Sequence, residues 1–426
     1  MFSVVVFLSC VTKNVRHMKV VVLGLGVSGK CAADYLRERG DEVLGVDRIQ
    51  TALEGIRVVS DAEQPQLENV ELLVKSPGID GSHPWVRAAL LRGIAVVGEI
   101  DLALAELDQR GKRILAVTGS NGKTTTTLLA AHLLKTSGTR ALAAGNIGVP
   151  LLSQIDGDDE IFVVELSSFQ LERIVIRPIF EGGVILNITP NHLDRHSSFD
   201  AYMQAKLKIA LCLKEHAPLY VTQQVLEVCG AQIKAPKIKK VETIWPLGYR
   251  DNRYRLFPHN VENALAAFAL TGVSLANLQK GIETFVSPPH RLEFVREIAG
   301  VRYMNDSKAT SVDAVIKALQ ALEAPIILIA GGVDKGGTFS DWLPFCRGKV
   351  KSVLALGEAA ERIERELGRE MSVQRVSSLQ EGVRIAARQA YAGDTVLLSP
   401  GCSSYDQFRD YLQRGETFTH IVRELL

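Results

Sequence analysis

The stretch Thr118-Gly-Ser-Asn-Gly-Lys-Thr-Thr-Thr126 decides the fold of this chain. It follows an apolar run, residues 113–117, that predicts a buried strand, and it precedes residues 128–134, which suit a helix. Glycines let the backbone approach a phosphate, and the amides and dipole at a helix start favour an anion. Lys123 can neutralise phosphate charge, and the Thr124 hydroxyl can bind Mg2+. The stretch therefore predicts a triphosphate-binding loop on a parallel sheet.

This loop departs from the general P-loop pattern at one position. The general pattern has a glycine five residues before Gly122, where this chain has Val117. The loop is therefore not the form most common in nucleotide hydrolases. A glycine turn beside an incidental lysine is the alternative, but the predicted strand and helix on either side favour phosphate binding.

The bulk composition is that of a globular enzyme. A chain of 426 residues is too long for one ordinary core, so two or three domains are expected. The net charge of +1 does not favour a nucleic-acid partner or membrane insertion, and we expect neither. None of the six cysteines forms a C-x-x-C pair, so a reducing cytoplasm is the expected setting.

The first 17 residues differ from the rest of the chain. Residues 1–11 are apolar, but they lack a basic segment in front and are too short to span a bilayer. Met18 leads directly into a predicted strand at residues 20–23. We therefore expect translation to start at Met18. Residues 1–17 would then be a mis-annotated start or a flexible extension. A cleaved export signal is the alternative.

Three blocks follow, and we expect three α/β domains at residues 18–97, 98–287 and 288–426. Strands alternate with helices in each block, which predicts Rossmann-like first and third domains around a central ATP-binding domain with a parallel sheet. A Ser-Pro-Pro-His-Arg segment at residues 287–291 is the predicted hinge before the third domain. Further strands are predicted at 42–46, 71–75, 161–164, 184–188, 326–329, 352–356 and 395–398, and helices at 32–39, 202–208, 359–367 and 379–390.

The first predicted strand ends in Gly24-x-Gly26-x-x-Gly29, and Asp47 ends the second. This is the dinucleotide-binding fingerprint, which indicates a phosphate-bearing nucleotide over the helix start but not hydride transfer. A glycine turn used only for packing is one alternative. An NAD-dependent dehydrogenase is another, but it would leave the triphosphate-binding loop without a role.

Polar side chains also follow two strands of the second block. Glu165 ends one, and the loop with His192, Asp194 and His196 follows the other. Ligands collect at the carboxyl ends of parallel strands, so we expect Glu165 and His192 to face the same rim as Lys123. A carboxylate there suits Mg2+. The alternatives are a helix-capping glutamate and a solvated turn.

Three polar turns follow strands of the third block, at residues 305–310, 331–337 and 399–408. They should gather on one rim, where lysines and hydroxyls suit a small dicarboxylate or a phosphate. Each turn could instead be a helix cap, since Asp306 and Ser404 are good cap residues. Three such turns in register favour a binding rim.

From Met18 onward the chain resembles the Mur ligase family. The loop at 118–126 matches the family's own P-loop variant, including the missing glycine. The segments 145–148, 165–170, 187–194, 259–263 and 289–291 are also family-like. Residues 306–310 and 399–408 resemble the members that add D-glutamate. The departures are Tyr405 and Tyr411, which are more polar than the Leu and Phe typical of those positions.

The resemblance implies an ATP-dependent amide ligase that adds D-glutamate to UDP-N-acetylmuramoyl-L-alanine through an acyl phosphate, in cytoplasmic peptidoglycan precursor synthesis. It implies ATP and two Mg2+ ions as cofactors, and we expect a monomer. Ligases of the same superfamily that add alanine, diaminopimelate or folyl glutamate are the nearest rivals. A P-loop switch protein would explain Lys123 but not the three polar rims.

The resemblance also implies roles for individual residues at each ligand. The UDP-linked substrate would contact Ser28, Gly29, Asp47, Ser76, Gly78 and Asn146. ATP would contact Gly119, Asn121, Gly122, Lys123, Thr124, Thr125, Asn263, Arg291 and Asp306. D-Glutamate would contact Lys308, Thr310, Lys335, Ser404, Tyr405 and Tyr411.

The implied catalytic residues are Lys123, Glu165, His192 and Lys206. Glu165 and Thr124 would bind one Mg2+, and His192 and Lys206 the second. Lys206 would act as a carbamate formed with CO2, which converts an amine into the oxygen ligand that Mg2+ prefers. Composition alone does not distinguish Lys206 from Lys208, because both lie on one predicted amphipathic helix.

Overall fold

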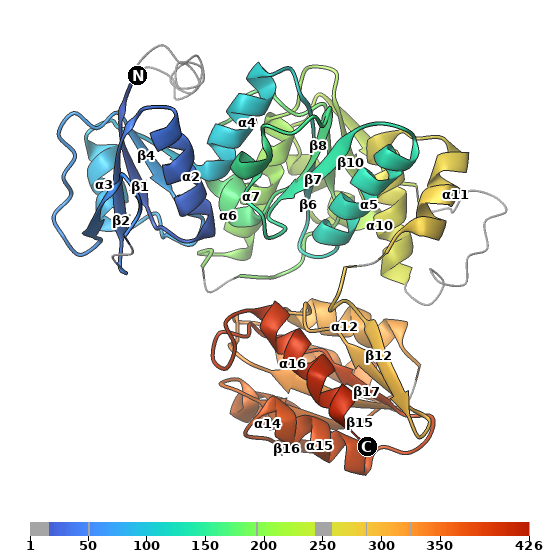
Figure 1. Cartoon of the computed structure of the whole chain (residues 1–426). Coiled ribbons are helices and arrows are strands. Elements are labelled where there is room, and N and C mark those ends of the chain that lie inside the picture. The colour runs from blue at the N-terminus through green and yellow to red at the C-terminus, as the bar shows by residue number, and fades with distance from the viewer. Residues whose placement is uncertain are drawn as a thin grey trace. The chain divides into compact units, whose positions relative to one another are not determined.

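The computed structural model describes residues 17–49, 52–192, 195–242, 258–286, 288–323 and 325–425. Nearly all of the predicted extension, and also Asp194 and Ser287, lie outside these ranges. The chain forms two compact units (Figure 1). The first comprises residues 1–188, 203–249 and 262–285, and the second comprises 189–202, 250–261 and 286–426. Within the described ranges, every helix is too short or too polar to cross a membrane.

The first sheet has five parallel strands in the order β3-β2-β1-β4-β5. Its strands are β1 (Lys19–Leu23), β2 (Glu42–Asp47), β3 (Arg57–Ser60), β4 (Leu72–Lys75) and β5 (Ala95–Gly98), and its helices are α2 (Val27–Glu38) and α3 (Pro84–Leu91). Buried apolar residues such as Val21, Leu73 and Trp85 form its core. The Rossmann-like fold predicted for this block is confirmed, although α2 starts at Val27 rather than Ala32.

Helix α4 (Glu99–Gln109) joins the first sheet to the second and is buried along most of its length. Its first turn carries two buried carboxylates. Glu99 accepts a hydrogen bond from the amide of Leu152 at 2.7 Å, and Asp101 accepts one from the amide of Val175 at 2.8 Å. Burial raises the pKa of Glu99 to about 7 and that of Asp101 to about 6. These bonds tie α4 to the segments around the second sheet.

The second sheet has six parallel strands in the order β11-β10-β9-β6-β8-β7. They are β6 (Arg113–Thr118), β7 (Ala141–Gly145), β8 (Ile161–Glu165), β9 (Gly182–Ile185), β10 (Pro218–Val221) and β11 (Lys237–Lys240). The helical segments are α5 (Lys123–Thr136), η1 (Leu151–Gln154), α6 (Ser168–Arg173), α7 (Phe199–Leu211), α8 (Gln223–Cys229), η2 (Gly230–Gln232), α10 (Pro258–Thr271) and α11 (Leu275–Thr284).

One strand of the second sheet differs from its prediction. The strand expected at 184–188 ends at Ile185, because the next residues leave the sheet to bond the phosphate-binding loop. The backbone oxygen of Asn187 accepts the amide hydrogen of Ser120 at 2.9 Å. The strand also begins earlier, with two glycines that carry no β-strand signal.

The third sheet lies in the second unit, in the order β12-β13-β17-β14-β15-β16. Only β12 runs antiparallel to its neighbour among the described strands of this sheet. The strands are β12 (Glu293–Ile298), β13 (Val301–Asn305), β14 (Ile326–Gly331), β15 (Val350–Leu356), β16 (Val373–Arg375) and β17 (Thr395–Leu398). The helices are α12 (Val312–Ala321), η3 (Phe339–Trp342), α13 (Leu343–Cys346), α14 (Ala360–Leu367), α15 (Leu379–Gln389) and α16 (Tyr411–Glu424).

Both faces of the third sheet are covered by helices. Leu328 of β14 faces one core together with Val315 of α12, whereas Ile329 faces another with Phe418 of α16. This alternation is the period-two pattern of a strand buried on both sides. The fold predicted for the third block is therefore confirmed, and the domain boundaries at 97/98 and 287/288 stay predictions.

The glycine turn after β1 offers a test of packing. A Cβ at Gly29 would lie 1.7 Å from the backbone oxygen of Gly24, whereas one at Gly26 would meet no described atom within 4 Å. We expect Gly29→Ala to lower the free energy of unfolding by about 3 kcal/mol, the upper range for overpacking. Gly26→Ala is the matched control and should cost less than about 1 kcal/mol. Equal losses in urea unfolding would contradict this account of the turn.

Candidate active site

The loop between β6 and α5 has the geometry of a phosphate-binding site. Gly122 caps α5 with a left-handed backbone (φ 82°), which favours glycine. The Lys123 ammonium donates to the backbone oxygens of Gly119 and Ser120, both at 2.9 Å. These bonds hold the ammonium against the loop at the start of α5, where the helix favours an anion.

Three other predicted ATP contacts, Asn263, Thr124 and Thr125, lie at this loop. A Cβ on Gly122 would lie 2.3 Å from the side-chain oxygen of Asn263, so the buried Asn263 of α10 packs directly on the loop. Thr125 is buried in the first turn of α5, while Thr124 beside it is half-buried. The structure therefore brings Gly122, Thr124, Thr125 and Asn263 together around Lys123.

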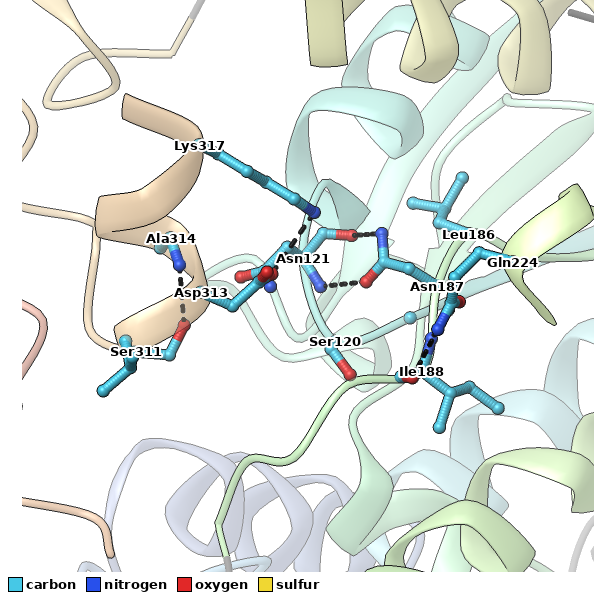
Figure 2. A network of polar contacts seen from close by, with 12 residues as sticks. Ser120, Asn121, Leu186, Asn187, Ile188, Gln224, Ser311, Asp313, Ala314 and Lys317 are labelled. Carbon is cyan, nitrogen blue, oxygen red and sulfur yellow. Dashed lines mark hydrogen bonds and ion pairs between the residues drawn. The ribbon is translucent and has the colours of Figure 1, made fainter. Parts of the chain in front are cut away.

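Asn187 clamps this loop from the neighbouring strand, as Figure 2 shows. Its side-chain oxygen accepts the amide hydrogen of Asn121 at 2.8 Å, and its side-chain nitrogen donates to the Asn121 oxygen at 3.1 Å. Gln224 holds Ile188 in the same two-bond manner, at 3.0 and 2.7 Å. Neither side-chain amide was predicted from the sequence to have a role. An asparagine just after a buried strand near the loop was the available signal.

Glu165 ends β8 beside this loop, with only 2% of its surface exposed. The Asn146 side chain donates to one of its carboxylate oxygens at 3.0 Å. The other oxygen is buried and has no hydrogen-bond partner among the described residues. An unpaired carboxylate oxygen at a phosphate-binding loop fits the coordination of a hard cation.

Lys206 lies on α7 with 1% of its surface exposed, and its amine donates to the Gly119 oxygen at 2.8 Å. Burial, followed by the charge of Lys123, lowers the pKa of Lys206 well below its ordinary value, while Glu165 opposes this shift. Lys208 instead donates to the backbone oxygen of Glu172 at the surface. The fold thus separates two lysines that composition could not, and it favours a neutral amine at Lys206.

His192 belongs to the second unit and has a left-handed backbone (φ 57°). His196 is buried and packs edge-on against Tyr202, with ring centroids 5.3 Å apart, as a core side chain does. Asp194, the third member of the predicted ligand cluster, lies outside the described residues. No group of three His, Cys, Asp or Glu side chains suited to a metal occurs in the described ranges. Mg2+ commonly takes one or two carboxylates with water and phosphate oxygens, so Glu165 and Thr124 remain compatible with it.

Most residues predicted to hold the UDP-linked substrate lie around the glycine turn after β1, but Asn146 follows β7 of the second sheet, beside Glu165. Asp47 accepts hydrogen bonds from the amides of Leu25 and Ile49, the latter at 2.9 Å. The Ser76 hydroxyl donates to the Gly24 oxygen at 2.6 Å. Both side chains therefore shape the turn. Of the other predicted contacts, Ser28 is half-buried, Gly29 is buried, and Gly78 and Asn146 are exposed.

The three polar turns of the third block follow β13, β17 and β14, which are neighbours in the sheet. They are bonded to one another. The amide of Gly401 donates to the Ala309 oxygen at 2.8 Å, and Val333 and Ser403 exchange two hydrogen bonds of 2.9 Å. The turns therefore form one rim at the carboxyl edge of the sheet.

Most residues predicted to bind D-glutamate lie in pairs on this rim. The Lys308 ammonium lies 3.6 Å from the centroid of the Tyr411 ring, and the Lys335 ammonium donates to the Thr310 hydroxyl at 3.3 Å. The nearby residues Ser404 and Tyr405 differ, since Ser404 is buried and Tyr405 is 74% exposed. Tyr405 therefore makes little contact with the rest of the rim.

Asp306 is buried at the same rim. It accepts hydrogen bonds from the Ser399 hydroxyl at 2.8 Å and from the amide of Leu292 at 3.2 Å, beside the half-buried Arg291. Burial raises the pKa of Asp306 to about 7, despite these bonds. Asp306 thus fixes the segment that carries Arg291, its predicted partner in ATP binding.

Arg414 of α16, which is 1% exposed, was not predicted from the sequence to have a role at this rim. Its guanidinium donates to the backbone oxygens of Ser307 and Cys402 at 2.8 and 3.1 Å and to the Ser307 hydroxyl at 3.0 Å. Burial lowers the pKa of Arg414 to about 10. The residue locks two of the rim turns together, but in the sequence it is one charged residue on an amphipathic helix.

Known protein families and relatives match most of this chain in sequence. The Mur ligase MurD-like N-terminal domain matches residues 18–98, the Mur ligase middle domain 117–250, and the Mur ligase glutamate ligase domain 290–402. The UDP-N-acetylmuramoylalanine--D-glutamate ligase of Protochlamydia amoebophila is 37% identical, covering 97% of this chain and 99% of its own. The enzyme of the same name from Chlamydia pneumoniae is 40% identical, and the match covers 96% of this chain and 98% of the relative.

Solved structures share the fold at low identity. MurF from Acinetobacter baumannii superposes with a TM-score of 0.61 at 17% identity, covering 94% of this chain and 93% of its own. UDP-N-acetylmuramate-alanine ligase MurC from Thermotoga maritima superposes with a TM-score of 0.59 at 17% identity. The match covers 96% of this chain and 99% of the MurC chain. The three family matches and the near full-length relatives together define an ATP-dependent ligase. The chain belongs to the Mur ligase family, whose members act in peptidoglycan synthesis.

The Asn187 clamp generates a prediction about nucleotide binding. We expect Asn187→Ala to weaken Mg-ATP binding about thirtyfold, because two hydrogen bonds worth about 1 kcal/mol each are lost from the loop. Isothermal titration calorimetry measures the Kd. Gln223→Ala is the control, since this exposed amide bonds Glu227 at the surface and should leave the Kd unchanged. An unchanged Kd in folded Asn187→Ala would show that the clamp is dispensable.

Proposed function

We propose that this chain joins D-glutamate to the alanyl carboxyl of UDP-N-acetylmuramoyl-L-alanine while ATP becomes ADP and phosphate. One observation carries the choice of amino acid. Two lysines, Lys308 and Lys335, stand on one rim with the hydroxyl of Thr310 and the ring of Tyr411, and two ammonium groups suit the two carboxylates of glutamate. The near full-length relatives named UDP-N-acetylmuramoylalanine--D-glutamate ligase support the same choice.

The proposed reaction has two steps. The alanyl carboxylate attacks the γ-phosphorus of ATP, forming an acyl phosphate as the bond to ADP breaks. The amine of D-glutamate then attacks the acyl carbon, and phosphate leaves from a tetrahedral intermediate as the amide forms. Lys123 neutralises phosphate charge in the first step, where alignment and electrostatics matter more than covalent help. Asn146, fixed by Glu165, would orient the reacting end of the UDP-linked substrate.

The metal ligands are part of the same proposal. Glu165 and Thr124 would hold one Mg2+, and His192 with carbamylated Lys206 a second. Bound Mg2+ would neutralise charge on the transferring phosphate. The unpaired Glu165 oxygen supports the first assignment, and the neutral state favoured at Lys206 supports the carbamate, since only a neutral amine attacks CO2.

We further propose that the chain acts as a monomer in the cytoplasm, on small-molecule substrates and ATP. All five cysteines in the described ranges are free thiols, which is compatible with a reducing compartment. The three sheets suggest closure of the domains over the substrates before the chemistry.

Phosphate release tests the proposed reaction. With Mg-ATP and UDP-N-acetylmuramoyl-L-alanine, we expect release that requires D-glutamate and is absent with L-glutamate, L-alanine or diaminopimelate. Lys123→Ala should fold normally and lower turnover at least a thousandfold, because phosphate charge is no longer neutralised. Release with another amino acid would change the pathway step but keep the mechanism. No release with any acceptor would refute the proposal.

The carbamate has its own test. Protein equilibrated with 13C-bicarbonate should show a carbamate carbon signal by NMR. The signal should disappear in Lys206→Ala and persist in Lys208→Ala, because Lys206 is the buried lysine whose neutral form is favoured. A missing signal in the wild-type protein, or one that persists without Lys206, would contradict the assignment.

A further inference from the structure

The loop that carries Lys335 has little rigidity of its own. It follows β14 as Gly-Gly-Val-Asp-Lys-Gly-Gly at 331–337, and Gly331, Gly332 and Gly336 all have positive φ angles of 123°, 128° and 80°. Glycine makes such a backbone accessible, but it also loses the most conformational entropy when it is fixed. A lysine in this loop keeps one position only if surrounding groups hold the loop.

Arg362 of α14 holds the loop on both sides of Lys335. Its guanidinium forms an ion pair with Asp334, the residue before Lys335, and donates to the backbone oxygen of Gly337, two residues after it, at 2.5 Å. The same group lies 5.2 Å from the centroid of the Phe339 ring. One planar side chain therefore fixes three points of the loop, which a lysine could not reproduce.

Glu366, one turn further along α14, completes this arrangement. One of its carboxylate oxygens accepts from Arg362 at 2.6 Å, and the other accepts from the amides of Phe339 and Ser340 at 2.7 and 3.2 Å. Helix α14 is a rigid support because Ile363 is fully buried in the core of the third sheet. The Arg362–Glu366 pair, which we call the loop clamp, thus joins residues 334–340 to that core.

The loop clamp also controls charge beside Lys335. Without a partner, the carboxylate of Asp334 would compete with a carboxylate ligand for the neighbouring ammonium and would repel that ligand. Arg362 neutralises Asp334 through this ion pair, and the Lys335 ammonium donates to the Thr310 hydroxyl on the same rim. Arg362 acts on the rim without belonging to the residues predicted to touch the amino acid.

We propose that Arg362 is a positioning residue that sets the affinity for the amino-acid substrate, by fixing the loop of Lys335 and neutralising Asp334. The substrate's identity rests on the proposed function, whereas the clamp itself stands on the contacts above. ATP and the UDP-linked substrate are assigned to other residues. A change in Arg362 should therefore affect one substrate selectively.

Steady-state kinetics test this selectivity. Arg362→Gln should raise KM for D-glutamate about tenfold, which corresponds to about 1.4 kcal/mol, with KM for ATP and UDP-N-acetylmuramoyl-L-alanine changed less than about twofold. Arg362→Lys, which keeps the charge but not the fork, should give an intermediate KM. Arg365→Gln is the matched control, an exposed arginine on the same helix that should leave all three values unchanged. Equal increases for all three substrates, or an unchanged KM for D-glutamate, would overturn the proposal.

Hydrogen exchange tests the clamp without substrates. Amides of residues 334–340 should exchange about tenfold faster in Arg362→Gln than in Arg365→Gln or the wild-type protein, while strands β14 and β15 keep their protection. Unchanged exchange in the loop would overturn the clamp whatever the enzyme's substrate. Faster exchange in a protein that releases no phosphate with D-glutamate would instead leave the clamp intact and refute the proposed function.

Discussion

A single backbone oxygen, that of Gly119, accepts hydrogen bonds from both Lys123 and Lys206. Two ammonium groups at one acceptor repel each other, and this repulsion adds to burial in lowering the pKa of Lys206. Lys206 is fully buried, whereas Lys123 is half-buried at the start of α5. The roles proposed for the two lysines, phosphate neutralisation for Lys123 and carbamate formation for Lys206, depend on this difference in burial.

The rims of the two units are built by the same principle. Glycine-rich loops provide backbone that can approach a ligand, and they are then held by side chains from rigid elements nearby. Asn187 does this for the phosphate-binding loop, and Arg414 and Arg362 do it for the turns around the third sheet. Loops that must be open to ligands are therefore held in one conformation by residues outside the predicted ligand contacts.

Runs of buried β-branched residues and glycine turns made most strands of the three sheets predictable, including β1, β6, β8 and β14. The edge strand β11 carries no such signal, because its Lys-Ile-Lys-Lys sequence is exposed and mostly polar. The residues that hold the loops were missed for a different reason. Asn187 and Arg414 act on partners fixed by tertiary packing, and only the fold reveals that Lys206 is buried while Lys208 reaches the surface.

The buried contacts of helix α4 determine where the chain could be cut between its first and second sheets. Its buried Glu99 and Asp101 find their donors, the amides of Leu152 and Val175, in segments of the second sheet, while Glu106 accepts from Tyr35 of α2 at 2.5 Å. Cutting the chain after α4 would leave Glu99 and Asp101 without these donors, whereas cutting before α4 would separate Glu106 from Tyr35. The domain built on the first sheet is therefore not an independent module. Exchanging this domain between family members would require α4 to match the surface against which it packs.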